Sequence, residues 1–165
     1  MNIDELKNLI KGGIFNSPTK GTLDLDTVVS ELINFRKEYP DNKYNIVIGT
    51  DSDKREQEIE FVCVVAIHRI GKGGRYFWLK IFDNRNLDLR SRIYQEATIS
   101  LALAWALLDG GIILHDELEI HVDIGQNGPT REMIKEIKGM ISGSGFFVKI
   151  KPEAFAASTL ADRHT

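Results

Sequence analysis

The sequence predicts an α/β domain built on one mixed five-stranded sheet with helices on both faces. Three observations support this fold class. Residues 44–82 contain three runs of β-branched and aromatic residues separated by short polar turns, which is typical of antiparallel strands. Later strand-like runs alternate with segments of helical periodicity, and strands connected through helices run parallel. The preceding residues are mainly helical in character. We therefore expect an N-terminal helical extension over residues 1–43, packed on a domain that spans residues 44–165.

The N-terminal extension predicts two helices joined by a loop. Residues 4–10 are a short helix candidate, and residues 11–22, KGGIFNSPTKGT, predict a loop because they are rich in Gly, Ser and Pro. Apolar residues recur at helical spacing from Leu25 to Tyr39. An aspartate can cap the start of this helix, and Pro40 ends it.

Three antiparallel strands are expected next. The first, Tyr44–Thr50, is apolar on both faces, so it should be central in the sheet and covered on both sides. Residues 60–69 and 75–82 form the second and third strands, and the intervening IGKGG predicts a hairpin turn.

The remaining elements alternate between helix and strand. A long helix should end at the Gly110–Gly111 pair, and Pro129 is suited to the first position of the next helix. The expected elements are a helix over residues 88–109, a strand over 117–124, a helix over 129–141, a strand over 146–150 and a helix over 152–163.

Composition sets limits on the class of protein. The chain has 165 residues and a net charge of −3, which fits one domain and does not suggest a general nucleic-acid binder. Acids are concentrated in residues 1–60, so the rest of the surface is basic if some later acids are metal ligands. Cys63 lies in an apolar run and should be a buried, inert thiol. The N-terminus lacks signal-peptide features, and the apolar helix run 97–108 is too short to span a bilayer. We expect a cytoplasmic protein without a membrane partner.

Four acids occur where a metal site could form. Asp51 ends the first strand, Glu96 interrupts the apolar stripe of the long helix, Asp123 ends the fourth strand, and Asp162 lies in the last helix. If the first and fourth strands are neighbours, Asp51 and Asp123 meet at one sheet edge. Adjacent carboxylates repel each other unless a cation lies between them, and Mg²⁺ or Mn²⁺ prefers such hard oxygen ligands.

Each acid also has a purely structural explanation. Asp51 and Asp123 can bond the backbone of a turn, Glu96 can pair with Arg92, and Asp162 can lie in a frayed terminus.

The choice between Asp51 and Asp53 as the first-strand ligand is open from the sequence. Side chains along a strand alternate between its two faces, which places Asp51 on the same face as Gly49. This favours Asp51, because Gly49 would leave room there for a metal or for substrate backbone. The polar run DSDKREQE resembles a turn, so we expect the alternation to break at Ser52 and Asp53 to act outside the primary ligand set.

This constellation of acids resembles the ribonuclease H-like superfamily. More closely, IVIGTDSD, HVDIGQNGPT, GSGFFVKIKPEAFAAS and ADRHT resemble the bacterial YkuK-like family, an uncharacterised ribonuclease H-like group, over Tyr44–Thr165. The resemblance implies a nuclease fold and a ligand set of Asp51, Glu96, Asp123 and Asp162.

The resemblance implies two-metal hydrolysis of phosphodiester bonds in RNA or DNA, with two Mg²⁺ or Mn²⁺ ions. Asp53, His121 and His164 are candidates for residues that surround the ligands. Two alternatives stay open: a catalytically silent module that binds nucleic acid or protein, and a metal-dependent phosphatase acting on a small phosphoester.

Two segments are candidates for contacts with nucleic acid. The hairpin HRIGKGGRYFW combines basic and stacking side chains, and GQNGPTRE precedes a helix whose N-terminus can bind an anion. A solvated hairpin tip and a plain capped helix are the structural alternatives. The candidate nucleic-acid-binding residues are Arg69, Lys72, Arg75, Tyr76, Asn127 and Thr130.

Overall fold

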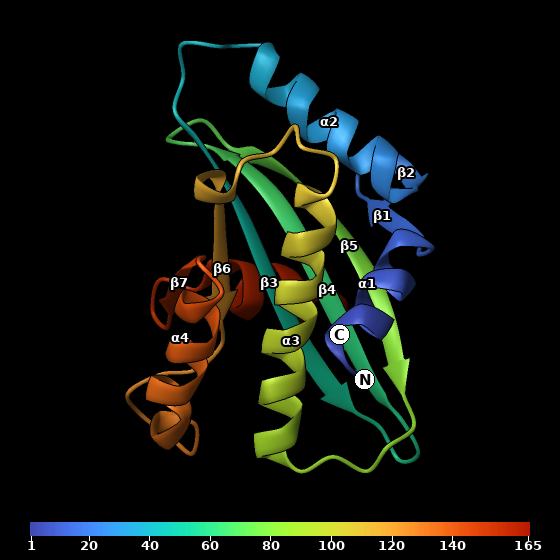
Figure 1. Ribbon diagram of the computed structural model, residues 1–165, viewed down its shortest axis with the longest axis vertical. Helices are drawn as coiled ribbons and strands as arrows, with labels where there is room; N and C mark the ends of the chain where they lie inside the picture. The colour runs from blue at the N-terminus through green and yellow to red at the C-terminus, as the bar shows by residue number, and fades with distance from the viewer.

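A computed structural model describes residues 1–165 and contains one mixed sheet (Figure 1). The strands β3, β4 and β5 are mutually antiparallel, whereas β6 runs parallel to β3 and β7 runs parallel to β6. The seven strands lie in the order β2-β1-β5-β4-β3-β6-β7. Their bounds are β1 Phe15–Ser17, β2 Gly21–Leu23, β3 Tyr44–Lys54, β4 Ile59–Arg69, β5 Gly74–Asp83, β6 Leu118–Val122 and β7 Phe147–Ile150.

Four α-helices pack on one face of this sheet, and short helical segments cover part of the other. In Figure 1, α3 crosses in front of β3 and β4, and the red C-terminal segment lies behind the sheet. That segment consists of one π-helical turn, η3, and one 3₁₀ turn, η4. The bounds are α1 Ile3–Lys11, α2 Leu25–Lys37, α3 Leu89–Leu108, α4 Ile134–Gly143, η1 His115–Glu117, η2 Arg131–Met133, η3 Ala156–Ala161 and η4 Asp162–His164. None of the helices combines the length and apolar character that crossing a membrane requires.

The mixed α/β sheet is confirmed, but the expected strand count is wrong. Residues 11–22 are not simply a loop, because β1 and β2 form a hairpin that adds two strands beyond β5. Asn16 pairs with Trp78 of β5, and Phe15 is fully buried, so this short hairpin is anchored by one aromatic side chain.

Three other element boundaries differ from expectation. β3 continues past Thr50 to Lys54, because β4 pairs with it along its whole length. The helix expected from Pro129 begins at Ile134, after η2. The C-terminal helix expected over residues 152–163 is replaced by η3 and η4, which begin only at Ala156.

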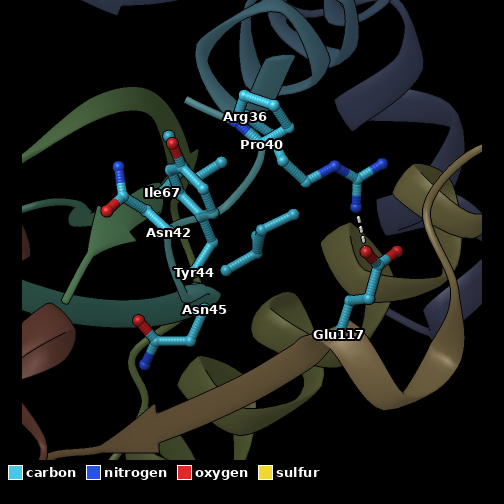
Figure 2. Close-up of a pocket in the computed structure, with 8 residues that line it drawn as sticks. Arg36, Pro40, Asn42, Tyr44, Asn45, Ile67 and Glu117 are labelled. Atoms are coloured by element: carbon cyan, nitrogen blue, oxygen red, sulfur yellow. Dashed lines mark hydrogen bonds and ion pairs between the residues drawn. The ribbon is translucent and has the colours of Figure 1, made fainter. Parts of the chain in front are cut away.

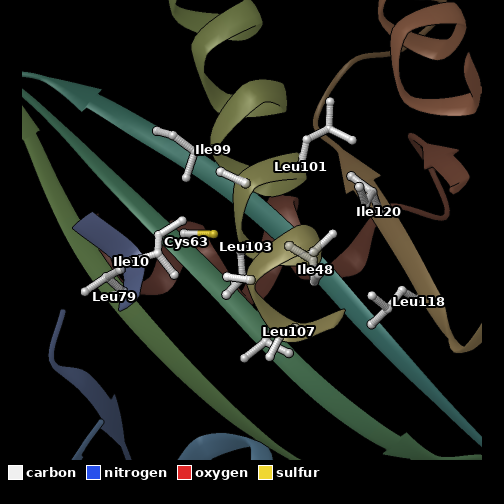
Figure 3. Close-up of a cluster of buried hydrophobic side chains, with 14 of the residues drawn as sticks. Ile10, Ile48, Cys63, Leu79, Ile99, Leu101, Leu103, Leu107, Leu118 and Ile120 are labelled. Carbon is white, nitrogen blue, oxygen red and sulfur yellow. The ribbon is translucent and has the colours of Figure 1, made fainter. Parts of the chain in front are cut away.

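The main core lies between α3 and the sheet. Figure 3 shows Ile48 and Cys63 from neighbouring strands facing Leu103 and Leu107 of α3. Asp88 caps the N-terminus of α3, because its Oδ1 accepts a hydrogen bond from the backbone N–H of Ser91 at 2.8 Å. Burial raises the pKa of the Cys63 thiol to about 12, so this cysteine is protonated and unreactive at neutral pH.

The second face of the sheet is closed by η3. Val47 and Ala66 pack against Ala156, and a Cβ atom at Gly49 would lie only 2.5 Å from the backbone nitrogen of Ala157. The space that Gly49 was expected to leave for a metal or substrate is therefore filled by the backbone of η3.

Candidate functional site

The carboxylates gather where β3 extends beyond its parallel neighbour. Pairing between β3 and β6 ends at Gly49 opposite His121, whereas β3 continues along β4 to Lys54. Asp51 lies on this open stretch, and Asp123 directly follows the end of β6. The open edge lets a side chain from α3 approach Asp51 past the end of the parallel pairing.

Glu96 of α3 reaches this edge. Its side chain is buried, and its Oε1 accepts a hydrogen bond from the Ser52 hydroxyl at 2.6 Å. Burial, with smaller contributions from the negative charges of Asp51 and Asp123, raises the pKa of Glu96 to about 8. The hydrogen bond from Ser52 and the charge of Arg92 oppose this rise. Glu96 is therefore protonated in the metal-free protein at neutral pH.

Asp51 also lies in an unfavourable environment for its charge. Burial raises its pKa to about 6, and the neighbouring charges of Asp123 and Asp162 act in the same direction. The backbone N–H of Ser52 and the positive charge of Arg92 oppose this rise. The four predicted acids thus belong to one electrostatic neighbourhood, because Asp123 and Asp162 act on Asp51, and Asp51 and Asp123 act on Glu96.

Asp123 faces a lysine that sequence analysis missed. Lys151 Nζ lies 2.9 Å from Asp123 Oδ1, although that buried oxygen has no partner in hydrogen-bonding geometry. The backbone N–H of Lys151 donates a hydrogen bond to the carbonyl oxygen of Ile124 at 2.9 Å. The aliphatic part of the Lys151 side chain packs against Gly125, where an added Cβ would lie 3.2 Å from the lysine Cβ. Only the tertiary pairing of β6 with β7 brings this lysine to the site.

The donors suit a hard divalent cation, but they do not form a finished cage. No three Asp, Glu, His or Cys side chains are placed to hold one metal ion. All four acids nevertheless offer oxygen ligands, two are partly or fully desolvated, and an oxygen of Asp123 lacks a hydrogen bond. This set fits Mg²⁺ or Mn²⁺ chemically, and coordination would require rotation of the side chains.

The three residues expected around the ligands lie in different environments. His121 is buried, with Nε2 2.6 Å from Oε1 of Glu119 and Nδ1 accepting a hydrogen bond from the Ala156 N–H at 3.2 Å. It therefore joins β6 to η3. His164 stacks on Trp78 with ring centroids 3.8 Å apart, and burial lowers its pKa.

The expected break in the alternation of β3 at Ser52 is wrong. The strand does not break at Ser52, because Ser52 pairs with Phe61 and Asp53 with Glu60. Asp53 therefore shares the face of Asp51, but its side chain is exposed and its nearest cation is Arg55 Nε, 3.8 Å away. The polar composition of this segment resembles a turn, yet cross-strand pairing keeps it extended.

Three of the hairpin candidates, Arg69, Lys72 and Arg75, lie toward the far end of the sheet, whereas Tyr76 contacts the C-terminal segment. Arg69 is opposite Tyr44 at the start of β3, whereas Asp51 is opposite Val62. Arg69 packs over aromatic rings and forms an ion pair with Glu38 at 3.4 Å. Lys72 is exposed, Arg75 forms an ion pair with Glu31, and Tyr76 lies 3.3 Å from His164.

The loop after β6 is nearer to the carboxylates. Asn127 is exposed, and the hydroxyl oxygen of Thr130 accepts a hydrogen bond from the Gly125 N–H at 3.4 Å. Because α4 begins only at Ile134, this loop does not place a helix N-terminus directly after Asp123.

A small pocket lies near the start of β3, away from the carboxylates (Figure 2). Its volume is about 200 Å³. Arg36 and Glu117, the charged residues that line it, form an ion pair with each other. Their charges are thus mutually satisfied, although Asn45 Oδ1 in the same lining is buried without a hydrogen-bond partner.

Comparison with known proteins agrees with this arrangement. A family model described as ribonuclease H-like matches residues 27–165. The chain is 29% identical over 170 residues to "Uncharacterized protein YkuK" of Bacillus subtilis (strain 168), covering 92% of this chain and 96% of that protein. No solved structure matches the chain. The match to YkuK confirms the resemblance seen in the motifs, and the chain belongs to the ribonuclease H-like family.

Proposed function

We propose that this protein is a divalent-metal-dependent nuclease that hydrolyses phosphodiester bonds of a nucleic acid. Its family is one of nucleases and nucleic-acid-binding modules. The observation that carries the proposal is that acids from four separate elements act on one another's charges near the open edge of β3. Two of them, Asp51 and Glu96, have raised pKa values in the absence of a cation. Such a costly arrangement is expected at functional sites more often than elsewhere.

Asp51, Glu96, Asp123 and Asp162 would hold Mg²⁺ or Mn²⁺. When bound, these ions supply an activated water and stabilise the leaving oxygen of the phosphodiester. The Ser52 hydroxyl orients Glu96 through its hydrogen bond, and Lys151 offsets the charge of Asp123. The four carboxylates make a protein nucleophile unnecessary in this scheme.

A catalytically silent nucleic-acid-binding module is the second candidate. It is favoured by the absence of a preformed ligand cage and by Lys151, which already provides a cation at Asp123. The two functions differ in whether a metal binds to the acids.

Calorimetric titration with Mn²⁺ and Mg²⁺ separates these candidates. The wild type should bind the ions, Asp51→Asn should lose most of that binding, and Asp53→Asn should serve as the matched control on the same strand face. Labelled RNA, DNA and hybrid substrates with Mn²⁺ then test cleavage. Failure of the wild type to bind either ion would refute the nuclease and favour the binding module.

A further inference from the structure

Arg92 lies beside the carboxylates, one helical turn before Glu96 on α3. Its side chain is half-buried, and its Nη1 lies 3.4 Å from both the carbonyl oxygen and the hydroxyl oxygen of Ser52. The same serine donates to Glu96 at 2.6 Å. Arg92 therefore faces the segment of β3 that carries Asp51, but the hydrogen bonds that hold it there are long.

This arginine lacks the carboxylate partner that six other arginines in the fold have. Arg36, Arg55, Arg69, Arg75, Arg85 and Arg90 each form an ion pair with a carboxylate. Arg92 forms none, although its charge influences both Asp51 and Glu96. The remaining two arginines, Arg131 and Arg163, are exposed. Arg92 is thus a half-buried guanidinium with unused donors.

A guanidinium has five N–H donors in a planar fork that matches the oxygens of a phosphate. Only Nη1 of Arg92 contacts protein oxygens. An incoming phosphodiester must also approach a group of acids that repels anions, and a cation at their margin offsets that repulsion.

We propose that Arg92 binds a phosphate group of the nucleic acid next to the carboxylates. The inference rests on the proposed function and adds a substrate contact that none of the acids can supply. The competing explanation is that Arg92 only holds Ser52 and moderates the charge of the acids. That explanation predicts altered stability with unchanged nucleic-acid affinity.

The test measures binding of labelled RNA, DNA and hybrid oligonucleotides by fluorescence anisotropy, with Ca²⁺ in place of Mg²⁺. Arg92→Gln should weaken binding about tenfold or more and reduce the dependence of log affinity on log salt by about one contact. Arg92→Lys should keep the salt dependence but lose part of the affinity, because it lacks the fork. Arg90→Gln is the control, since Arg90 is exposed on the same helix and pairs with Glu136.

The outcomes distinguish the inference from the proposed function. Equal affinity of Arg92→Gln and Arg90→Gln, with wild-type binding intact, would overturn the role of Arg92 alone. If the wild type binds no oligonucleotide, the proposed function fails as well. Thermal unfolding and Mn²⁺ calorimetry verify that the variants are folded and still bind metal. If Arg92→Gln does not fold, the Arg92→Lys variant provides the test. An oligonucleotide affinity of Arg92→Lys equal to that of the wild type would then overturn the inference.

Discussion

Replacing Glu96 with Gln should stabilise the metal-free protein at neutral pH. Burial raises the pKa of Glu96 from its ordinary value of 4.5 to about 8. The folded state therefore binds this proton more tightly than the unfolded state does, so the free energy of unfolding falls as pH rises from 4.5 to about 8. Glutamine does not titrate, and its amide oxygen can still accept the hydrogen bond from Ser52.

The size of the effect follows from the two pKa values of Glu96. At pH 7 the unfolded carboxyl is about 2.5 pH units above its pKa, while the folded one is still mostly protonated. At about 1.4 kcal/mol per unit, the wild type should be less stable than Glu96→Gln by about 3 kcal/mol. Below pH 4.5 the difference should nearly vanish, because both side chains are then neutral in both states.

Urea unfolding in EDTA at pH 4, 7 and 8 measures this difference. Glu132→Gln is the control, because Glu132 is exposed and should shift stability little at any of these pH values. Adding Mn²⁺ should stabilise the wild type and not the Gln variant. Parallel stability profiles of Glu96→Gln and wild type, or a less stable variant at pH 7, would refute the reasoning, since Glu96 would then be ionised and compensated in the folded state.

Three further predictions concern single side chains. Asp51→Asn should abolish metal-dependent cleavage in a folded protein, whereas Asp53→Asn should leave measurable activity; the opposite result would assign the ligand to Asp53. Lys151→Met should increase the affinity for Mn²⁺ in calorimetry, because its ammonium lies 2.9 Å from a carboxylate of the site; weaker binding would mean that the lysine positions that carboxylate. Gly49→Ala should lower the free energy of unfolding by about 2 kcal/mol or more, because its Cβ would meet the backbone of η3 at 2.5 Å. Gly139→Ala, with open space around it, is the control, and equal stability of the two variants would contradict the close packing.

The sequence predicted elements whose signals are local and long. The apolar stripe of α3 and the runs that form β3, β4 and β5 carry their own periodicity, so their type and order could be inferred. Glu96 was identifiable because a charge in an apolar helix stripe is costly unless it is compensated.

Other features depend on pairing between distant segments. Strands of three residues, such as β1 and β2, are too short to show alternation, and the glycines and the proline around them resemble a loop. The polar end of β3 is extended because β4 supplies its hydrogen bonds. The approach of Lys151 to Asp123 follows from the parallel pairing of β6 and β7, which no local pattern records.

The hairpin at the start of the chain also covers part of the outer edge of β5, where Asn16 pairs with Trp78. Without β1 and β2, the ten-residue strand β5 would be the outer strand, with a long row of unpaired backbone groups. In the complete sheet, the outermost strands are instead β2, with three residues, and β7, with four. Short edges are poor templates for pairing with another chain. A fragment that begins at residue 44 would therefore be prone to aggregate, even though it keeps all four carboxylates.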